Sequence, residues 1–202
     1  MVKTLLACFF LISLTAVEAH AGAPTDQVKT TVDNVLEILK DKELKKPEKT
    51  SERRTMIRKA VDERFDFEEM AKRSLALYWK DRSPEERKEF IPLYSDLLER
   101  AYIRKIERYT DEKVQYVDES VKEEYALVRT RIVTKENVEI PVEYRLLKKG
   151  EQWEVYDVVV EGVSLVNNYR TQFNRIIRRH SYEELVKRMK SKQEGELAKE
   201  AK

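Results

Sequence analysis

The residues best suited by type to covalent chemistry lie in the C-terminal third of the chain. Ser164 stands in the segment Gly162–Val166, between a predicted strand and a predicted helix, which is the setting of a nucleophile elbow of the form G-x-S-x-G. Val166 replaces the second glycine of that motif. A nucleophilic serine also needs a base, and the only histidine beyond the first residues of the chain is His180, at a predicted helix-to-helix junction. The sequence therefore favours a helix N-cap at Ser164 over catalysis.

Asp157 is a carboxylate inside an otherwise apolar predicted strand, between Tyr156 and Val158. A buried carboxylate at this position is either a proton acceptor or a structural acceptor for an arginine, a hydroxyl or a backbone amide, and the structural role is the commoner one. Arg170 is the candidate partner because it follows closely along the chain. The acidic residues show no metal-loop spacing, so we expect neither a metal site nor a cofactor.

Four arginines, Arg170, Arg175, Arg178 and Arg179, make one basic stretch in a predicted helix. Two interpretations remain open: a solvated helix face, or a docking surface for an acidic partner or for phosphate headgroups. Over the whole chain, 40 Lys and Arg residues are balanced by 38 Asp and Glu residues with interspersed signs. That balance argues against the concentrated basic face of a nucleic-acid-binding protein.

The first 21 residues have the three parts of a secretory signal peptide. Lys3 forms the positive n-region, Leu5–Val17 the apolar h-region and Ala19–Ala21 a small-x-small cleavage site. The h-region is too short to span about 30 Å of hydrocarbon as a helix. We therefore expect cleavage near Ala21 and a soluble mature protein outside the cytoplasm.

Cys8 is the only cysteine, and Leu5–Cys8 resembles a lipoprotein cleavage box. Too few residues precede that box to form an h-region, so we expect no lipid anchor. Cleavage near Ala21 would remove Cys8 and leave no thiol for a disulfide, a nucleophile or a metal site. The remaining chain is long enough for one domain with a sizeable core. We expect that domain over residues 22–190 and a polar tail over residues 191–202.

Helical periodicity dominates the first half of the chain. It predicts a helix within residues 25–45, and a second one that is capped by Thr50 or Ser51 and turns Met56 inward. Asp66 is predicted to cap a third helix, with Glu69 at N3 as in a capping box. The clearest start is Ser83–Glu86, with a serine cap, proline at N1 and glutamate at N3. The helix that it opens is predicted to run about 26 residues, or about 39 Å, with Pro92 bending it or loosening one turn.

From residue 112 the apolar period changes to two, which predicts strands. The clearest strands are Tyr125–Val133, Val138–Leu146 and Trp153–Val160, with a weaker one at Val114–Val117. Helices capped by Ser164 and Ser181 follow. The predicted fold is α+β: a curved antiparallel meander of about four strands, packed with N-terminal and C-terminal helices around an apolar cavity.

Two groups of motifs together resemble the MlaC family, also called the toluene-tolerance auxiliary family. The resemblance covers about residues 25–190, and its C-terminal part is the sharper match. One departure is Tyr78, which follows Leu77 where the family commonly has glycine. The matching segments are Phe65–Ala71, Leu77, Trp79, Ser83–Arg87 with Phe90, then Trp153–Val158, Glu161–Val166, Asn168–Arg170 and Phe173.

The resemblance implies a periplasmic phospholipid carrier rather than an enzyme. Proteins of this kind move lipids between an outer-membrane lipoprotein complex and an inner-membrane ABC transporter with an MCE-domain subunit. They hold the acyl tails inside the domain and leave the headgroup largely exposed. We expect a monomer with phospholipid as its cargo. The alternatives are a small-ligand enzyme and a periplasmic chaperone that binds apolar peptides on the same scaffold.

A carrier must shield its cargo's tails from water, since each buried CH₂ contributes about 0.8 kcal/mol. Periodicity does not distinguish a cavity wall from an ordinary core, so we expect about half of the candidate lining residues to touch lipid. These candidates are Phe67, Met70, Leu75, Leu93, Leu97, Tyr102, Val142, Tyr144, Val155, Val158, Val163, Leu165 and Tyr169.

Overall fold

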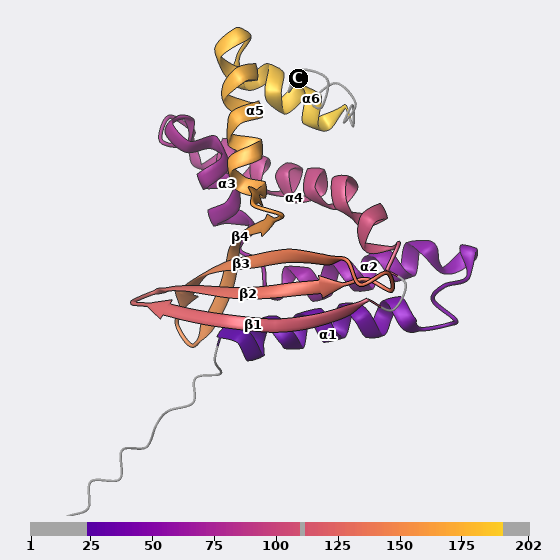
Figure 1. Cartoon of the computed structure of the whole chain (residues 1–202). Coiled ribbons are helices and arrows are strands. Elements are labelled where there is room, and N and C mark those ends of the chain that lie inside the picture. The colour runs from indigo at the N-terminus through magenta and orange to yellow at the C-terminus, as the bar shows by residue number, and fades with distance from the viewer. Residues whose placement is uncertain (1–23, 110–111, 192–202) are drawn as a thin grey trace, which may run out of the picture.

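The computed structural model describes residues 24–109 and 112–191 (Figure 1). The predicted signal peptide, Cys8 and all but the first residue of the predicted tail lie outside these ranges. The described helices are α1 (Pro24–Lys40), η1 (Pro47–Lys49), α2 (Thr50–Asp62), α3 (Phe67–Leu75), η2 (Ala76–Trp79), α4 (Pro84–Ile106), α5 (Leu165–Arg179) and α6 (Tyr182–Lys190). The strands are β1 (Lys113–Lys122), β2 (Tyr125–Val133), β3 (Glu139–Lys149), β4 (Gln152–Val160) and β5 (Val163–Ser164).

The five strands form one antiparallel sheet in the order β1-β2-β3-β4-β5, which confirms the predicted α+β meander. β2 has the predicted bounds, whereas β1 is longer than the four residues expected. The additional strand, β5, is a two-residue return that pairs Ser164 with Val159. In the part of the chain that the structure describes, none of the helices combines the length and apolar character that crossing a membrane requires.

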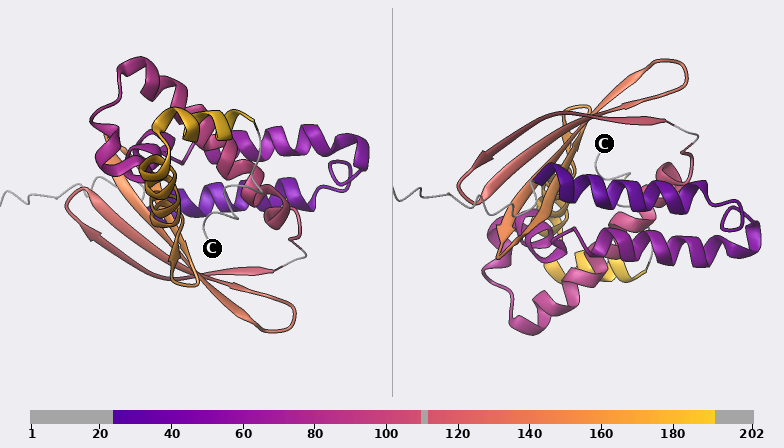
Figure 2. Two further views of the ribbon diagram at one scale, coloured as in Figure 1. Left: turned by 90° about the horizontal axis from the view of Figure 1, so that it is seen from above. Right: turned by 90° about the horizontal axis from the view of Figure 1, so that it is seen from below.

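The sheet has an apolar face and a charged face, as alternation requires. The apolar face, called the inner face from here on, carries Val128 on β2, Val142 on β3 and Val155 on β4, all buried. The other face carries ion pairs such as Arg131 with Glu139 at 3.2 Å. α1 covers the inner face and lies between the sheet and α2 (Figure 2).

A second core lies among α3, α4, α5 and α6. Its centre is aromatic: the rings of Phe90 and Phe173 meet edge to face with centroids 5.7 Å apart, and those of Tyr94 and Tyr169 do the same at 5.7 Å. The hydroxyl of Tyr94 accepts a hydrogen bond from Ser74 at 2.9 Å, which satisfies the polar end of this buried ring. Burial raises the pKa of Tyr94 well above that of a free tyrosine, so the ring stays neutral.

A short segment between α2 and α3 joins the two cores. Val155 of β4 donates from its backbone N–H to the carbonyl of Arg64 at 2.8 Å and accepts from the N–H of Asp66 at 2.9 Å. Phe65, between those two residues, packs against both the sheet core and the helical core. The edge of β4 beyond β5 is thereby paired by the chain's own backbone, and the helical layer is fixed to the sheet.

The predicted helix starts at Asp66, Ser83, Ser164 and Ser181 are all confirmed. Ser83 and Glu86 form a complete capping box, and Ser164 and Ser181 each accept a hydrogen bond from a backbone N–H of the helix they open. Asp66 likewise accepts from the N–H of Glu69 at 2.9 Å, although the Glu69 side chain pairs with Arg73 rather than closing a box.

Three local predictions are wrong. Neither Thr50 nor Ser51 caps α2, because η1 runs directly into it and Lys49 occupies the cap position; Met56, expected to face inward, is 41% exposed. α4 ends at Ile106 after 23 residues, shorter than predicted, and it continues as a helix through Pro92.

Candidate functional site

The apolar residues predicted to line one cavity belong to two different cores. Seven lie in or against the helical core: Phe67, Met70, Leu75, Leu93, Leu97, Tyr102 and Tyr169. Five lie in or against the sheet core: Val142, Tyr144, Val155, Val158 and Leu165. Val163 belongs to neither, because it is 57% exposed and lines a polar pocket instead.

Burial divides these candidates further. Met70 and Val155 are 0% exposed, so in this conformation they offer no surface to a ligand. Five candidates are only partly buried and are the better placed to meet one: Phe67, Leu93, Tyr102, Tyr144 and Leu165. Lipid contact by any of the thirteen stays a prediction.

Partly buried apolar side chains pack against the sheet core, on α1 and on the inner face that it covers. We call this set of residues the α1–sheet seam. Apart from Tyr144, the sequence analysis did not select these residues, although the alternation in β2 and β3 would have placed several of them on the inner face. Its members are Val32 on α1 and Tyr116, Ile132, Ile140, Tyr144 and Val160 on the sheet.

Tyr116 contributes a buried hydroxyl group to the α1–sheet seam. This hydroxyl has no hydrogen-bond partner among the described residues. Burial, reinforced by the nearby Tyr144 and Asp33, raises the pKa of Tyr116 well above its ordinary value. A neutral, buried hydroxyl inside an apolar boundary is a hydrogen-bond donor for a ligand that enters there.

The hydrogen bonds that join α1 to the sheet lie near the start of the helix. Thr25 donates from its backbone N–H to the carboxylate of Glu119 on β1 at 2.7 Å. The side-chain oxygen of Gln27 accepts from the N–H of Trp153 at 2.9 Å and from Arg64 at 2.6 Å. Farther along the helix, the contact is made by apolar side chains such as Val32, which can separate from the sheet without breaking its backbone ladder.

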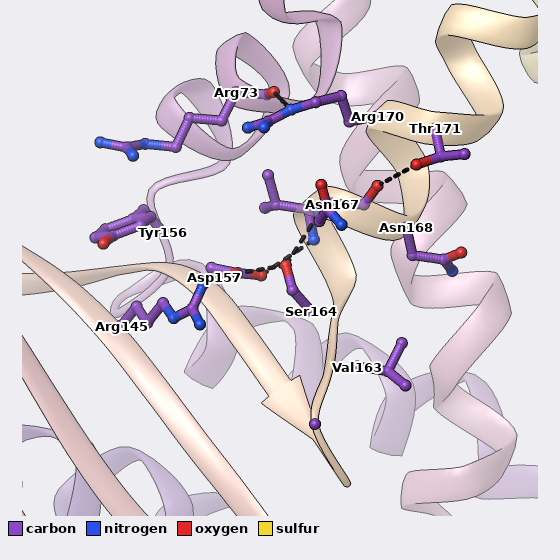
Figure 3. A pocket seen from close by; sticks show the side chains of 12 residues that line it. Arg73, Arg145, Tyr156, Asp157, Val163, Ser164, Asn167, Asn168, Arg170 and Thr171 are labelled. Atoms are coloured by element: carbon purple, nitrogen blue, oxygen red, sulfur yellow. Dashed lines mark hydrogen bonds and ion pairs between the residues drawn. The ribbon is translucent and has the colours of Figure 1, made fainter.

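A polar pocket of about 660 Å³ lies where β4, β5 and α5 meet. We call it the arginine pocket because Arg73, Arg145 and Arg170 line it, together with Tyr156, Asp157 and the first residues of α5 (Figure 3). The second pocket described lies between α2 and α4, and it has both acidic and basic walls, including Glu99 and Arg54.

Asp157 is the structural centre of the arginine pocket and is 3% exposed. One carboxylate oxygen accepts from Ser164 at 2.7 Å and from Arg145 at 3.2 Å, and the other accepts from the N–H of Val166 at 3.0 Å. The structural interpretation is confirmed, with an arginine, a hydroxyl and an amide all bound. Its predicted partner is wrong: Arg170 instead donates to the carbonyl of Arg73 at 2.9 Å. Arg145 pairs with Asp157 because they are opposite each other on β3 and β4.

Ser164 is a helix cap, as the sequence favoured. Its oxygen accepts from the N–H of Asn167 at 3.0 Å while its hydroxyl donates to Asp157. His180 lies at the opposite end of α5, about 24 Å away at 1.5 Å per residue. These two residues therefore do not form a nucleophile–base pair. In residues 24–109 and 112–191, no three His, Cys, Asp or Glu side chains come together as metal ligands.

The four arginines of the predicted basic stretch all lie on α5, and their role as a docking surface stays a prediction. Arg170 lines the arginine pocket, whereas Arg175, Arg178 and Arg179 lie farther along α5 and do not line it. Arg73 and Arg145 were not among the predicted site residues. Pairing β3 with β4 in register would have placed Arg145 next to Asp157, but nothing in the local sequence brings Arg73 of α3 to the same place.

Ser164, the residue best suited to nucleophilic chemistry, is a helix cap, and α1 and the sheet meet through apolar side chains. The MlaC protein family model matches residues 29–191, and the chain belongs to this family. The resemblance seen in the sequence motifs is thereby confirmed.

Two known proteins are similar over nearly the whole chain. The Intermembrane phospholipid transport system binding protein MlaC of Haemophilus influenzae is 24% identical over 195 residues, which cover 93% of this chain and 89% of that protein. A phospholipid-binding protein from Ralstonia solanacearum, solved in complex with a phospholipid, superposes with a TM-score of 0.75 at 24% identity. That comparison covers 87% of this chain and 99% of the other, and it shows that the two share a fold.

Proposed function

We propose that this protein is a soluble phospholipid carrier of the periplasm that holds acyl tails at the α1–sheet seam. Membership of the MlaC family supports this function, as do the names of the Haemophilus and Ralstonia relatives. The observation that carries the proposal is the set of partly buried apolar side chains on α1 and on the inner face of the sheet.

The energetics of this seam suit a carrier. Burying one 16-carbon tail contributes about 13 kcal/mol at most, at about 0.8 kcal/mol per CH₂. A carrier must release its cargo, so part of that free energy has to be offset when the protein opens. Separation of Val32 and its neighbours on α1 from the sheet exposes apolar surface, and the empty protein recovers that cost by closing.

Within the carrier, we propose that the tails contact the partly buried side chains first. Among the predicted lining residues, Tyr144 and Leu165 border the sheet core, and Phe67, Leu93 and Tyr102 border the helical core. The fully buried candidates, such as Met70, are proposed to be reached only when the two cores move apart.

The proposal includes a route for the cargo. After cleavage near Ala21, the monomeric protein would exchange lipid with an outer-membrane lipoprotein complex and with an inner-membrane ABC transporter that has an MCE-domain subunit. Catalysis forms no part of this role. If the protein were an enzyme on the same fold, Asp157→Asn or Ser164→Ala would abolish its activity. If it were a peptide chaperone, apolar peptides would compete with lipid for binding.

The direct test is to purify the mature protein from its own host, record native mass spectra and extract bound lipid. The expected result is a protein mass increased by a whole number of phospholipids, together with uptake of labelled phospholipid from vesicles by the delipidated protein. A protein that carries no phospholipid and takes none from vesicles would contradict the proposal.

A further inference from the structure

Three guanidinium groups from three different elements meet at the arginine pocket, away from the α1–sheet seam. Arg73 comes from α3, Arg145 from β3 and Arg170 from α5. Figure 3 shows Tyr156 between the side chains of Arg73 and Arg145, with Arg170 reaching toward the backbone of Arg73. These arginines are 72 and 25 positions apart in sequence, so only the fold gathers them.

Each guanidinium is held in place by a contact that leaves other donors available. Arg73 lies 4.1 Å from the ring centroid of Tyr156 and donates from Nε to Glu69 at 2.8 Å. Arg145 donates from Nη1 to Asp157, and Arg170 donates from Nε to the carbonyl of Arg73. A guanidinium has five N–H donors, so each retains N–H groups for a ligand. Because the groups are already oriented, a ligand does not have to order them.

The charge of the pocket lining is positive. It contains three arginines and one acidic residue, Asp157, whose carboxylate is already engaged by Arg145, Ser164 and the N–H of Val166. α5 begins at the pocket and adds the partial positive charge of a helix N-terminus. The side-chain amides of Asn167 and Asn168 supply further neutral donors on the same wall.

We propose that the arginine pocket binds a phosphate-type oxyanion, either a free phosphate group or the phosphate of a lipid headgroup. Planar guanidinium groups donate two parallel hydrogen bonds to such an anion, which is why arginine is favoured where phosphate is recognised. The volume of about 660 Å³ is large enough for a phosphate with a substituent. This site is distinct from the α1–sheet seam, and the two proposals can fail independently.

The test titrates the purified mature protein with inorganic phosphate and, separately, with glycerophosphoethanolamine, a phospholipid headgroup without tails. Binding is followed by calorimetry and by the Nε–Hε NMR signals of the arginines. The expected result is saturable binding of at least one probe, with shifts at Arg73, Arg145 and Arg170. Preference for phosphate identifies a free phosphate ligand, and preference for the glycerophosphodiester identifies a headgroup. Absence of saturable binding of either probe overturns the proposal.

Variants locate the binding within the molecule. Arg170→Gln, at an exposed position, is expected to weaken binding of the preferred probe about tenfold, as expected for loss of a charge-assisted hydrogen bond. Arg178→Gln is the matched control, since it removes the same charge from an exposed position of the same helix outside the pocket. An equal loss in both variants would mean diffuse attraction to a basic helix and would overturn the proposal. Lipid copurification, measured on the same samples, reports on the carrier function separately.

Discussion

At the scale of single residues, the best-defined interaction is that of Asp157. One carboxylate links β4 to β3 through Arg145, to the cap of α5 through Ser164 and to the α5 backbone through Val166. The loss of any one of the three donors lowers the stability of the fold, since it removes a charge-assisted hydrogen bond to a buried carboxylate.

Replacing Asp157 with asparagine tests this network. Asp157→Asn removes the charge that Arg145 and the N-terminus of α5 face, and it turns one acceptor oxygen into a donor. We expect the free energy of unfolding, measured in urea, to fall by about 2 kcal/mol, allowing for the partial exposure of Arg145. Asp118→Asn is the control, because that 53%-exposed carboxylate pairs with Arg129 at the surface, where we expect less than about 1 kcal/mol. Equal losses would contradict a special role for Asp157.

At the scale of elements, α2 and α4 are joined by a compact charge cluster near the end of α4. Glu107 accepts from Arg54 at 2.8 and 3.0 Å and from Arg53 at 2.7 Å. The hydrogen bonds from Arg54 are the main cause of a Glu107 pKa of about 2, with Arg53 contributing and burial opposing. The link is therefore strongest when Glu107 is ionised.

This link makes the stability depend on pH in a defined window. The native pKa of Glu107 lies below its ordinary value of 4.5, so its contribution is fully present above pH 4.5 and is lost as the pH falls toward 2. We expect Glu107→Gln to lower the free energy of unfolding by about 2 kcal/mol at pH 7 and to have little effect near pH 2. Urea unfolding of both proteins across this range measures the difference, and a pH-independent difference would contradict the linkage.

The mobile partner in lipid binding, according to our proposal, is α1. Val32→Trp places a bulky ring in the α1–sheet seam, where it would occupy the space proposed for an acyl tail. Overpacking of this kind lowers the free energy of unfolding by about 1–3 kcal/mol. We expect the variant to fold and to carry clearly less copurified phospholipid. Lys29→Trp, on the exposed face of the same helix, is the matched control and should carry the wild-type amount. Equal lipid content in the two variants would place the cargo elsewhere.

At the scale of the whole molecule, two cores share one chain and meet at Phe65. The sheet core includes Val28 of α1, and the helical core includes Phe90 and Phe173. The only described backbone pairing of the α2–α3 segment with the sheet is at Val155. The Asp157 network, which joins β4 to α5, is a second link between the two cores.

Lipid loading should stabilise the whole protein. A ligand that binds only the folded state adds about 2.7 kcal/mol at a concentration 100 times its Kd. We expect the delipidated protein to unfold at lower urea than the loaded protein, and vesicles to restore the higher midpoint. Calorimetry of both forms measures the same difference as a change in Tm. A midpoint that does not respond to delipidation would contradict cargo binding to the folded state.

Much of the fold could be predicted from the sequence because the relevant signals are local. Strand β2 follows from alternation within nine residues, and the start of α4 follows from Ser83, Pro84 and Glu86, which interact within one turn. The capping role of Ser164 is local for the same reason. The predicted cap of α2 was wrong because η1, a competing local structure, precedes the helix directly.

The sequence alone also determined the family, through motifs in both halves of the chain, and it favoured a structural role for Asp157 over a role as proton acceptor. Only the tertiary structure decided that Asp157 binds Arg145 rather than Arg170, and that the apolar candidates divide between two cores. It also decided that Arg73 lines one pocket together with Arg145 and Arg170. The reason is physical. Periodicity reports which face of an element is buried, whereas the identity of what buries it depends on strand register and packing between distant segments.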